Sequence, residues 1–242
     1  MIRLVTLDMA GTTVTDQHEV EACFAEAARK TGLVVSDDRI LAMQGLHKYS
    51  VFQTLWEETL GSTTHPEWQM RVDKSYKVFT EVLENHYLTH SITPTEGCPE
   101  LFDFLHEQGI AIALTTGFYR KVADIILQRL GWLNGLNEQR VGSTSSRIQA
   151  SVTSDEVEKG RPHPFMIQKA MQVLGVPDPA QVINVGDTPS DIQSGRAAGC
   201  RLSVAVINGT HRADQLAPHQ PDRLLDSLFD LIPLIQEINA TR

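Results

Sequence analysis

Two acidic motifs in this 242-residue sequence combine residue types that suit phosphoryl chemistry. The first, DMAGTT at residues 8–13, directly follows an apolar run and begins with Asp8. A carboxylate in such a place acts as a nucleophile when a cation neutralises the incoming anion. Gly11 permits a tight turn, and Thr12 offers a hydroxyl and an N–H group to an anion. An aspartate that only caps the turn is the alternative interpretation.

The second acidic motif, VGDTPSD at residues 185–191, also follows an apolar run and places Asp187 four residues before Asp191. If Asp8 and Asp187 lie at neighbouring strand ends, their like charges repel unless a cation lies between them. Mg²⁺ suits that place because it needs few protein carboxylates and keeps several waters or substrate oxygens. Asp191 can accept hydrogen bonds or hold an arginine. The alternative is a turn with two solvated acids.

Two further motifs offer anion-binding groups. LTTG at residues 114–117 places two hydroxyls and Gly117 before a predicted helix, which suits either an anion site or an ordinary threonine cap. KGRPHPF at residues 159–165 places Arg161 just before a helix that its prolines begin. A guanidinium matches two phosphate oxygens at once, although a single arginine here is also compatible with a solvated surface charge.

Short apolar runs alternate with helical patterns and would position these motifs. The runs cover residues 2–7, 110–114, 181–185 and 202–207, and the helical patterns cover 99–108, 120–130 and 164–174. Continuous apolar strands suit a parallel sheet covered on both faces, and a glycine follows each helix where a left-handed cap is expected. We therefore predict an α/β fold with a doubly wound, Rossmann-like parallel sheet, whose strand ends form a ligand crevice.

Residues 17–92 break the alternation, because one helical pattern follows another without a strand. The stretch is too long for a connecting loop. We therefore predict a small all-α cap domain at 17–92, inserted into a catalytic core of residues 1–16 and 93–242. Its Phe52, Trp56 and Trp68 suit either the core of the cap or a homodimer interface.

The composition excludes several classes of protein. A net charge of −9 argues against a nucleic-acid binder. No apolar run approaches the roughly 20 residues that span a bilayer, so no membrane partner is expected. Three widely spaced cysteines form neither a disulfide framework nor a metal motif. Together these features predict a cytoplasmic protein without a nucleic-acid or membrane partner.

The four motifs together resemble the haloacid dehalogenase superfamily, over residues 1–16 and about 93–210. The resemblance implies that Asp8 attacks phosphorus and forms an aspartyl-phosphate. It implies a Mg²⁺ ion held by Asp8, the Ala10 carbonyl and Asp187, with Asp191 in support. It also implies phosphoryl binding by Gly11, Thr12, Thr116, Gly117 and Arg161. Thr116 is preferred to Thr115 because it directly precedes Gly117.

Two departures from the superfamily pattern indicate a subgroup. Ala10 stands where most phosphatases of the superfamily carry an acid, a group worth about 10²–10⁴-fold in rate. Arg161 stands where a lysine is usual. Both departures, and the stretch Gly45-Leu46-His47-Lys48, resemble phosphonoacetaldehyde hydrolase (phosphonatase). The resemblance implies that Lys48 forms a Schiff base with an aldehyde and that P–C cleavage needs no acid on a leaving oxygen. A lysine that only lies at a helix start is the alternative.

The match to the phosphonatase pattern is incomplete. That pattern has a histidine three residues after the lysine, where this chain has Val51, and a tyrosine where this chain has Phe118. His47 or His18 is a candidate substitute. The leading interpretation is a Mg²⁺-dependent hydrolase of a small phosphonate, phosphonoacetaldehyde or a relative. The alternatives are a phosphate monoester hydrolase for a small organic phosphate, and a phospho-ligand binding protein without activity.

Overall fold

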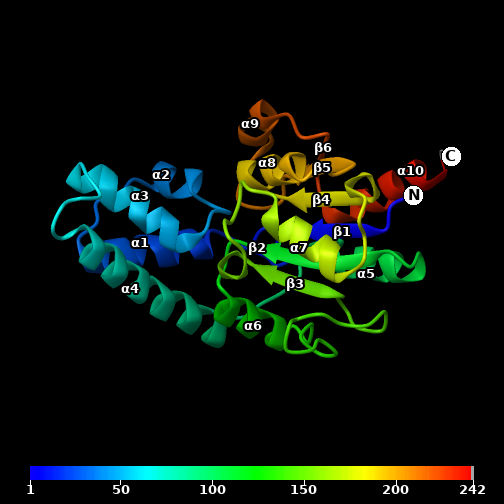
Figure 1. Ribbon diagram of the computed structural model, residues 1–242, viewed down its shortest axis with the longest axis horizontal. Coiled ribbons are helices and arrows are strands. Elements are labelled where there is room, and N and C mark those ends of the chain that lie inside the picture. Colours follow the sequence, from blue (N-terminus) through cyan, green and yellow to red (C-terminus); the bar gives the residue numbers. More distant parts are fainter. Residues whose placement is uncertain (241–242) are drawn as a thin grey trace.

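The computed structural model describes residues 1–240, which form a six-stranded parallel sheet with helices around it and a helical segment beside it (Figure 1). The strand order is β3-β2-β1-β4-β5-β6. The strands are β1 (Leu4–Leu7), β2 (Ala111–Thr116), β3 (Ala150–Thr153), β4 (Val182–Gly186), β5 (Leu202–Val206) and β6 (Arg223–Leu225). The predicted doubly wound α/β fold is confirmed.

The central strand, β1, determines where the motifs meet. It pairs with β2 on one side and β4 on the other, with Leu7 opposite both Leu114 and Val185. The motifs that follow these three strands therefore leave the sheet at the same edge. This is the crevice that the sequence predicts for a doubly wound sheet.

Two apolar clusters cover the opposite faces of the sheet. Leu4 packs with residues of α7 on one face, whereas its neighbour Val5 belongs to the larger cluster that contains residues of α5, α6 and α10. Alternate side chains of a strand point to opposite faces, so a strand buried on both sides must be apolar throughout. The helices of this part are α5 (Cys98–Glu107), α6 (Arg120–Arg129), α7 (Phe165–Val173), α8 (Pro189–Ala197), α9 (Ala213–Leu216) and α10 (Leu231–Ala240).

Four helices between β1 and β2 lie together beyond one end of the sheet (Figure 1). They are α1 (Glu19–Thr31), α2 (Asp37–Ala42), α3 (Lys48–Leu60) and α4 (Trp68–Thr89). Their own core is aromatic: the rings of Phe24 and Phe52 stack with centroids 4.3 Å apart, and Trp56 donates to the Ser75 hydroxyl at 2.9 Å. Phe52 and Trp56 thus belong to this core, and the homodimer stays a prediction.

Cys23 and Cys98 are buried, Cys200 is half-buried, and all three are free thiols. Within residues 1–240, no helix has the length and apolar character needed to cross a membrane.

Candidate active site

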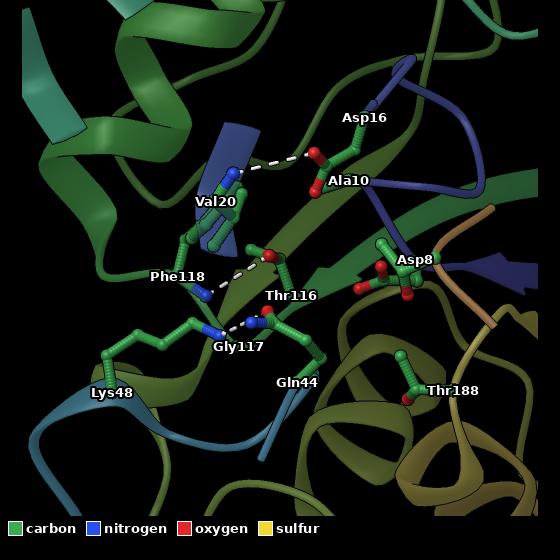
Figure 2. Close-up of a pocket in the computed structure, with 12 residues that line it drawn as sticks. Asp8, Ala10, Asp16, Val20, Gln44, Lys48, Thr116, Gly117, Phe118 and Thr188 are labelled. Atoms are coloured by element: carbon green, nitrogen blue, oxygen red, sulfur yellow. Dashed lines mark hydrogen bonds between the residues drawn. The ribbon is translucent and has the colours of Figure 1, made fainter. Parts of the chain in front are cut away.

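A cavity lies where the helical segment meets the carboxyl ends of β1, β2 and β4 (Figure 2). Its internal volume is about 20 Å³, which is room for about one water molecule and far below the range of open ligand sites. It is lined by Asp8, Ala10, Asp16, Val20, Gln44, Gly45, Lys48, Thr116, Gly117, Phe118, Thr188 and Thr210. Asp8, Lys48 and Thr116 come from three different elements, so the fold brings sequence-predicted residues of both parts into one cavity.

Arg161 links Asp8 to Asp191 beneath this cavity. Its Nη1 lies 2.6 Å from Asp8 Oδ1, and its Nε lies 2.8 Å from Asp191 Oδ1. Its Nη2 donates to both the carbonyl and the hydroxyl of Thr115. All five guanidinium hydrogens form a rigid fork, so several partners fix one orientation.

The groups that hold Arg161 in place are not the ones that the sequence predicts. We expected the prolines that follow it to begin the next helix and thereby fix it. In the structure α7 begins at Phe165, with Pro164 as its N-cap residue. The ion pairs with Asp8 and Asp191, rather than a helix start, hold the guanidinium in place.

Asp187 lies at the end of β4 and is completely buried. Its Oδ1 accepts a hydrogen bond from the Thr12 hydroxyl at 3.0 Å, and its Oδ2 accepts from the N–H and the hydroxyl of Thr210 at 2.8 and 2.7 Å. A Cβ atom at Gly11, whose φ is +86°, would lie 2.3 Å from Asp187 Oδ2. Gly11 is therefore needed both for its left-handed turn and for this close approach.

The site contains three carboxylates and one guanidinium, that of Arg161, so negative charge is in excess. One oxygen each of Asp8, Asp187 and Asp191 lies within 4.8 Å of the others, and all three residues are buried. Burial is the main cause that raises the pKa of Asp8 to about 6 and of Asp187 to about 6, and repulsion from Asp8 adds to the latter. Buried oxygens with excess negative charge are the donor set that Mg²⁺ prefers, so these residues fit a divalent cation.

Asp191 has a different position from the other two carboxylates. Its Oδ2 accepts from the N–H of Thr188 at 3.1 Å and completes a capping box at the start of α8. Its Oδ1 faces Arg161 without hydrogen-bond geometry. The residue therefore anchors the arginine and the helix, as the sequence analysis expected for a supporting group.

Lys48 is buried in the cavity wall at the first residue of α3. Its Nζ donates to the amide oxygen of Gln44 at 3.2 Å (Figure 2). Among the described residues, no carboxylate forms an ion pair with it. Burial lowers the pKa of Lys48 to about 8, even though Asp8 and Asp16 act in the opposite direction. A helix N-terminus also disfavours a cation, so the structure favours a partly neutral amine.

The loop before Lys48 contacts the sheet part through two glycines. Gly45 has a φ of +75°, and a Cβ there would lie 2.4 Å from Ser190 Oγ. A Cβ at Gly117 would lie 2.6 Å from the Gly45 carbonyl oxygen. Because neither position has room for a side chain, the two loops approach closely enough to close one side of the cavity.

The predicted phosphoryl-binding residues do not all face the cavity. Thr116 and Gly117 line it, and the Thr116 hydroxyl accepts a hydrogen bond from the N–H of Phe118 at 3.1 Å. Thr12 has other partners: its hydroxyl donates to Asp187, and its N–H donates to the Met9 carbonyl. Thr12 therefore contacts Asp187 and does not line the cavity, and the same is true of Gly11.

The candidate histidines lie away from the cavity lining. His18 is exposed, with Nδ1 2.8 Å from Glu21. His47 pairs with the Ser50 hydroxyl and lines a separate groove on the outside of the loop. Val51, which stands where the phosphonatase pattern has histidine, packs into the apolar core. Neither histidine supplies the group that the pattern would place beside Lys48.

Four polar residues of the cavity lining were not predicted as site residues from the sequence: Asp16, Gln44, Thr188 and Thr210. Asp16 is buried and accepts from the N–H of Glu19 at 2.7 Å. The spacing of Asp16 and Glu19 before an amphipathic helix is a capping signal that could have drawn attention to it. Gln44 lies one turn before Lys48 in the chain, but nothing in its sequence context marks it.

Comparison with known proteins agrees with this fold and site. Residues 2–199 match the family model described as haloacid dehalogenase-like hydrolase. The chain is also 32% identical over 224 residues to phosphonoacetaldehyde hydrolase from Bacillus cereus (strain AH187), which covers 86% of this chain and 77% of that protein. The chain therefore belongs to the haloacid dehalogenase-like hydrolases, in their phosphonatase-like subgroup.

Solved structures show the same fold. One is a phosphonoacetaldehyde hydrolase-like protein from Oleispira antarctica, with a TM-score of 0.77, 20% identity and coverage of 99% of this chain and 93% of that chain. Another is a hydrolase from Pseudomonas syringae, with a TM-score of 0.76, 21% identity and coverage of 98% and 99%. The solved structures confirm the fold, while the family model and the Bacillus cereus relative confirm the superfamily, the subgroup and the hydrolase class expected from the motifs.

Proposed function

We propose that the protein is a Mg²⁺-dependent phosphonatase that cleaves the P–C bond of a small phosphonate, phosphonoacetaldehyde or a close relative. The observation that carries this proposal is Lys48: a buried amine with a lowered pKa lines the same cavity as the carboxylate of Asp8. An ester hydrolase needs an acid for the leaving oxygen and has little use for a neutral amine. An aldehyde phosphonate needs the amine, because an imine can accept the electrons of the breaking bond.

The chain's own groups divide the reaction between them. The Lys48 amine adds to the aldehyde carbon, and loss of water leaves a protonated imine. Asp8 then attacks phosphorus, and the P–C electron pair moves into the substrate to give an enamine on Lys48. Protonation of the enamine carbon and addition of water release the aldehyde from Lys48, and a second water hydrolyses the aspartyl-phosphate to phosphate and free Asp8. Arg161, already 2.6 Å from Asp8 Oδ1, would balance charge on the transferred phosphoryl group. Thr116 and Gly117 would contact its oxygens from the end of β2.

The metal site belongs to the same proposal. Asp8, the carbonyl of Ala10 and Asp187 would hold Mg²⁺, which when bound offsets the repulsion between the carboxylate of Asp8 and the anionic substrate. Asp191 would act through Arg161 and the start of α8. Residues 17–92 would form the cap, whose close contact at Gly45 and Gly117 shields the cavity from water.

A substrate panel tests the proposal. Purified protein is assayed with Mg²⁺ on phosphonoacetaldehyde, other small phosphonates, small phosphate esters and a generic aryl phosphate. We expect inorganic phosphate to be released from an aldehyde-bearing phosphonate, with little turnover of the esters. Lys48→Arg keeps the positive charge but forms no imine, because the pKa of an arginine guanidinium stays above about 12. It should abolish P–C cleavage.

The competing function gives the opposite pattern. A phosphate monoester hydrolase would turn over esters faster than phosphonates, and Lys48→Arg would leave that activity largely intact because a positive charge would suffice to bind the substrate. A phospho-ligand binding protein would turn over neither class. Either pattern would contradict a phosphonatase.

A further inference from the structure

Imine chemistry at Lys48 requires a proton donor, and the obvious candidates are absent from the cavity. Position 10 is alanine, position 51 is valine, and His18 and His47 lie outside the lining. Dehydration of the first adduct between an amine and an aldehyde releases hydroxide unless an acid protonates the oxygen. Besides Asp8, the carboxyl group in the lining is that of Asp16, which precedes α1 and lines the cavity together with Lys48 (Figure 2).

The start of α1 fixes Asp16 in this position. Its Oδ1 accepts from the N–H of Glu19 at 2.7 Å and, more weakly, from the N–H of Val20 at 3.5 Å. The residue is nine-tenths buried. Since one oxygen is engaged by the helix start, the carboxyl group is held in a single orientation at the cavity wall (Figure 2).

The side chain of Glu19 connects Asp16 to solvent. Glu19 is half-buried, accepts from the N–H of Gln17, and shares a hydrogen bond with the carboxyl of Asp16. Two carboxyl groups share a hydrogen bond only when one of them carries a proton. Burial, with the hydrogen bond and charge of Glu19 next, raises the pKa of Asp16 to about 8, whereas the pKa of Glu19 is lowered. Asp16 is thus the member that holds the proton.

Other titratable groups face Asp16 from each neighbouring element. They are Glu19 and Cys23 on α1, Lys48 on α3, Tyr87 on α4 and Asp187 after β4. Cys23 and Tyr87 have raised pKa values through burial, so both stay neutral near pH 7. Repulsion from Glu19 and then from Asp187 raises the pKa of Asp16, and the contribution of Glu19 would remain when Mg²⁺ offsets the charge of Asp187.

We propose that Asp16 is the acid and base of the imine steps at Lys48, with Glu19 as its proton relay to solvent. The proposal rests on the proposed function and adds a residue that the motifs do not contain. It accounts for how the site functions with Ala10 and Val51 in place of an acid and a histidine.

The proton balance of the step is as follows. After the Lys48 amine has added to the aldehyde, the carbinolamine hydroxyl takes the proton of Asp16. The C–O bond breaks, its electron pair leaves with the oxygen as water, and the nitrogen lone pair forms the C=N bond. Asp16 is then a carboxylate. After P–C cleavage, Asp16 takes a proton from solvent through Glu19 and gives it to the enamine carbon, which produces the imine of the aldehyde product. When water then adds to this imine, a proton of the water passes to Asp16 and the acid is restored.

Asp16→Asn separates this role from helix capping, because the asparagine oxygen still accepts from the N–H groups of α1. The protein is mixed with phosphonoacetaldehyde, quenched with borohydride at increasing times and analysed by intact mass. We expect the reduced adduct on Lys48 to form at least about 100-fold more slowly than in the wild type. Asp178→Asn, the same change at an exposed capping residue, is the matched control and should behave as wild type.

Glu19→Gln gives a second measurement. Loss of the charge and the hydrogen bond of Glu19 lowers the pKa of Asp16, so the alkaline limb of the kcat profile should move to lower pH by about one unit. A purely structural role for Asp16 would leave this limb in place. If Asp16→Asn traps adduct at the wild-type rate, or if Glu19→Gln leaves the limb unmoved, Asp16 is not the acid, and the phosphonatase proposal still stands. If the wild type traps no adduct at all, both proposals fail.

Discussion

Arg161 and Lys48 are two buried cations that lie around one cavity, and the structure treats them in opposite ways. Arg161 has carboxylates on two sides, 2.6 and 2.8 Å away, and its pKa is raised further by them. Lys48 has an amide oxygen at 3.2 Å, and its pKa is lowered to about 8. A permanently charged group suits a phosphoryl anion, and a partly neutral amine suits an aldehyde.

The sheet and the helical segment also differ in the kind of groups that they bring to the cavity. The sheet supplies groups locked by several partners each, such as Asp187 with its three hydrogen bonds from Thr12 and Thr210. Lys48, at the start of α3, and Asp16, just before α1, have pKa values near 8 that are set mainly by burial. Groups held by several hydrogen bonds or ion pairs therefore lie at the strand ends, and the two groups whose pKa lies near 8 lie at or just before helices of the helical segment.

The largest expected effect is at the carboxylate that Arg161 holds. Asp8→Asn keeps the shape of the side chain but removes the nucleophile and weakens a metal ligand, so kcat should fall by at least about 10³-fold. Steady-state phosphate release measures it, on fresh protein whose mass excludes deamidation. Retention of more than a few per cent of activity would show that Asp8 is not the nucleophile.

Replacement of the Arg161 guanidinium by an amine tests whether the fixed, forked charge of Arg161 matters. Arg161→Lys cannot contact Asp8, Asp191 and Thr115 together, so kcat/KM should fall about 10–100-fold. Arg140→Lys is the matched control, because Arg140 pairs with Asp124 outside the cavity. An unchanged kcat/KM in Arg161→Lys would mean that the geometry of the fork is unimportant.

A carboxylate placed beside Lys48 tests whether the reaction depends on a neutral amine. In Gln44→Glu the new charge lies beside Nζ and should raise the pKa of Lys48 by at least about one unit. In the proposed mechanism activity requires the neutral amine and rises with pH through this pKa, so the acid limb should move to higher pH and activity at neutral pH should drop about tenfold. Gln128→Glu, on the exposed side of α6, is the control. A fixed acid limb would exclude Lys48 as the titrating group.

The smallest expected effect concerns the metal. Mg²⁺ bound to the native state alone stabilises it by RT ln(1 + [L]/Kd), and each kcal/mol corresponds to about 2–4 °C in Tm for a chain of this size. We expect a rise of a few degrees in the wild type and none in Asp187→Asn. A melting temperature indifferent to Mg²⁺ in the wild type, with phosphate also present, would contradict the metal site.

Much of the fold could be predicted because its central strands are apolar throughout. The runs at β1, β2, β4 and β5 were found to within two residues. The edge strands β3 and β6 were not, since Ala150–Thr153 is small and half polar and Arg223–Leu225 has only three residues. A strand this short, or one that mixes small and polar residues, gives no hydrophobic pattern that a sequence analysis can detect, even though β3 is buried.

The candidate site could be predicted only where a motif marks it. Asp8, Arg161 and Asp187 lie at strand ends in recognisable motifs, and the structure brings them together. Asp16 and Gln44 could not be predicted as site residues, because their importance depends on the way in which the helical segment folds over the sheet. The partners of Thr12 and Thr115 likewise emerge only from tertiary contacts.

The central claim, that Lys48 is a nucleophile while Arg161 is a fixed charge, is tested most directly by trapping. The wild-type protein is incubated with phosphonoacetaldehyde and Mg²⁺, reduced with borohydride, and analysed by intact mass and peptide mapping. The account predicts one reduced adduct, located on Lys48, together with loss of activity, and no adduct in Lys48→Arg. A protein that releases phosphate from the phosphonate at full rate, yet traps no adduct or traps it on another lysine, would contradict the account.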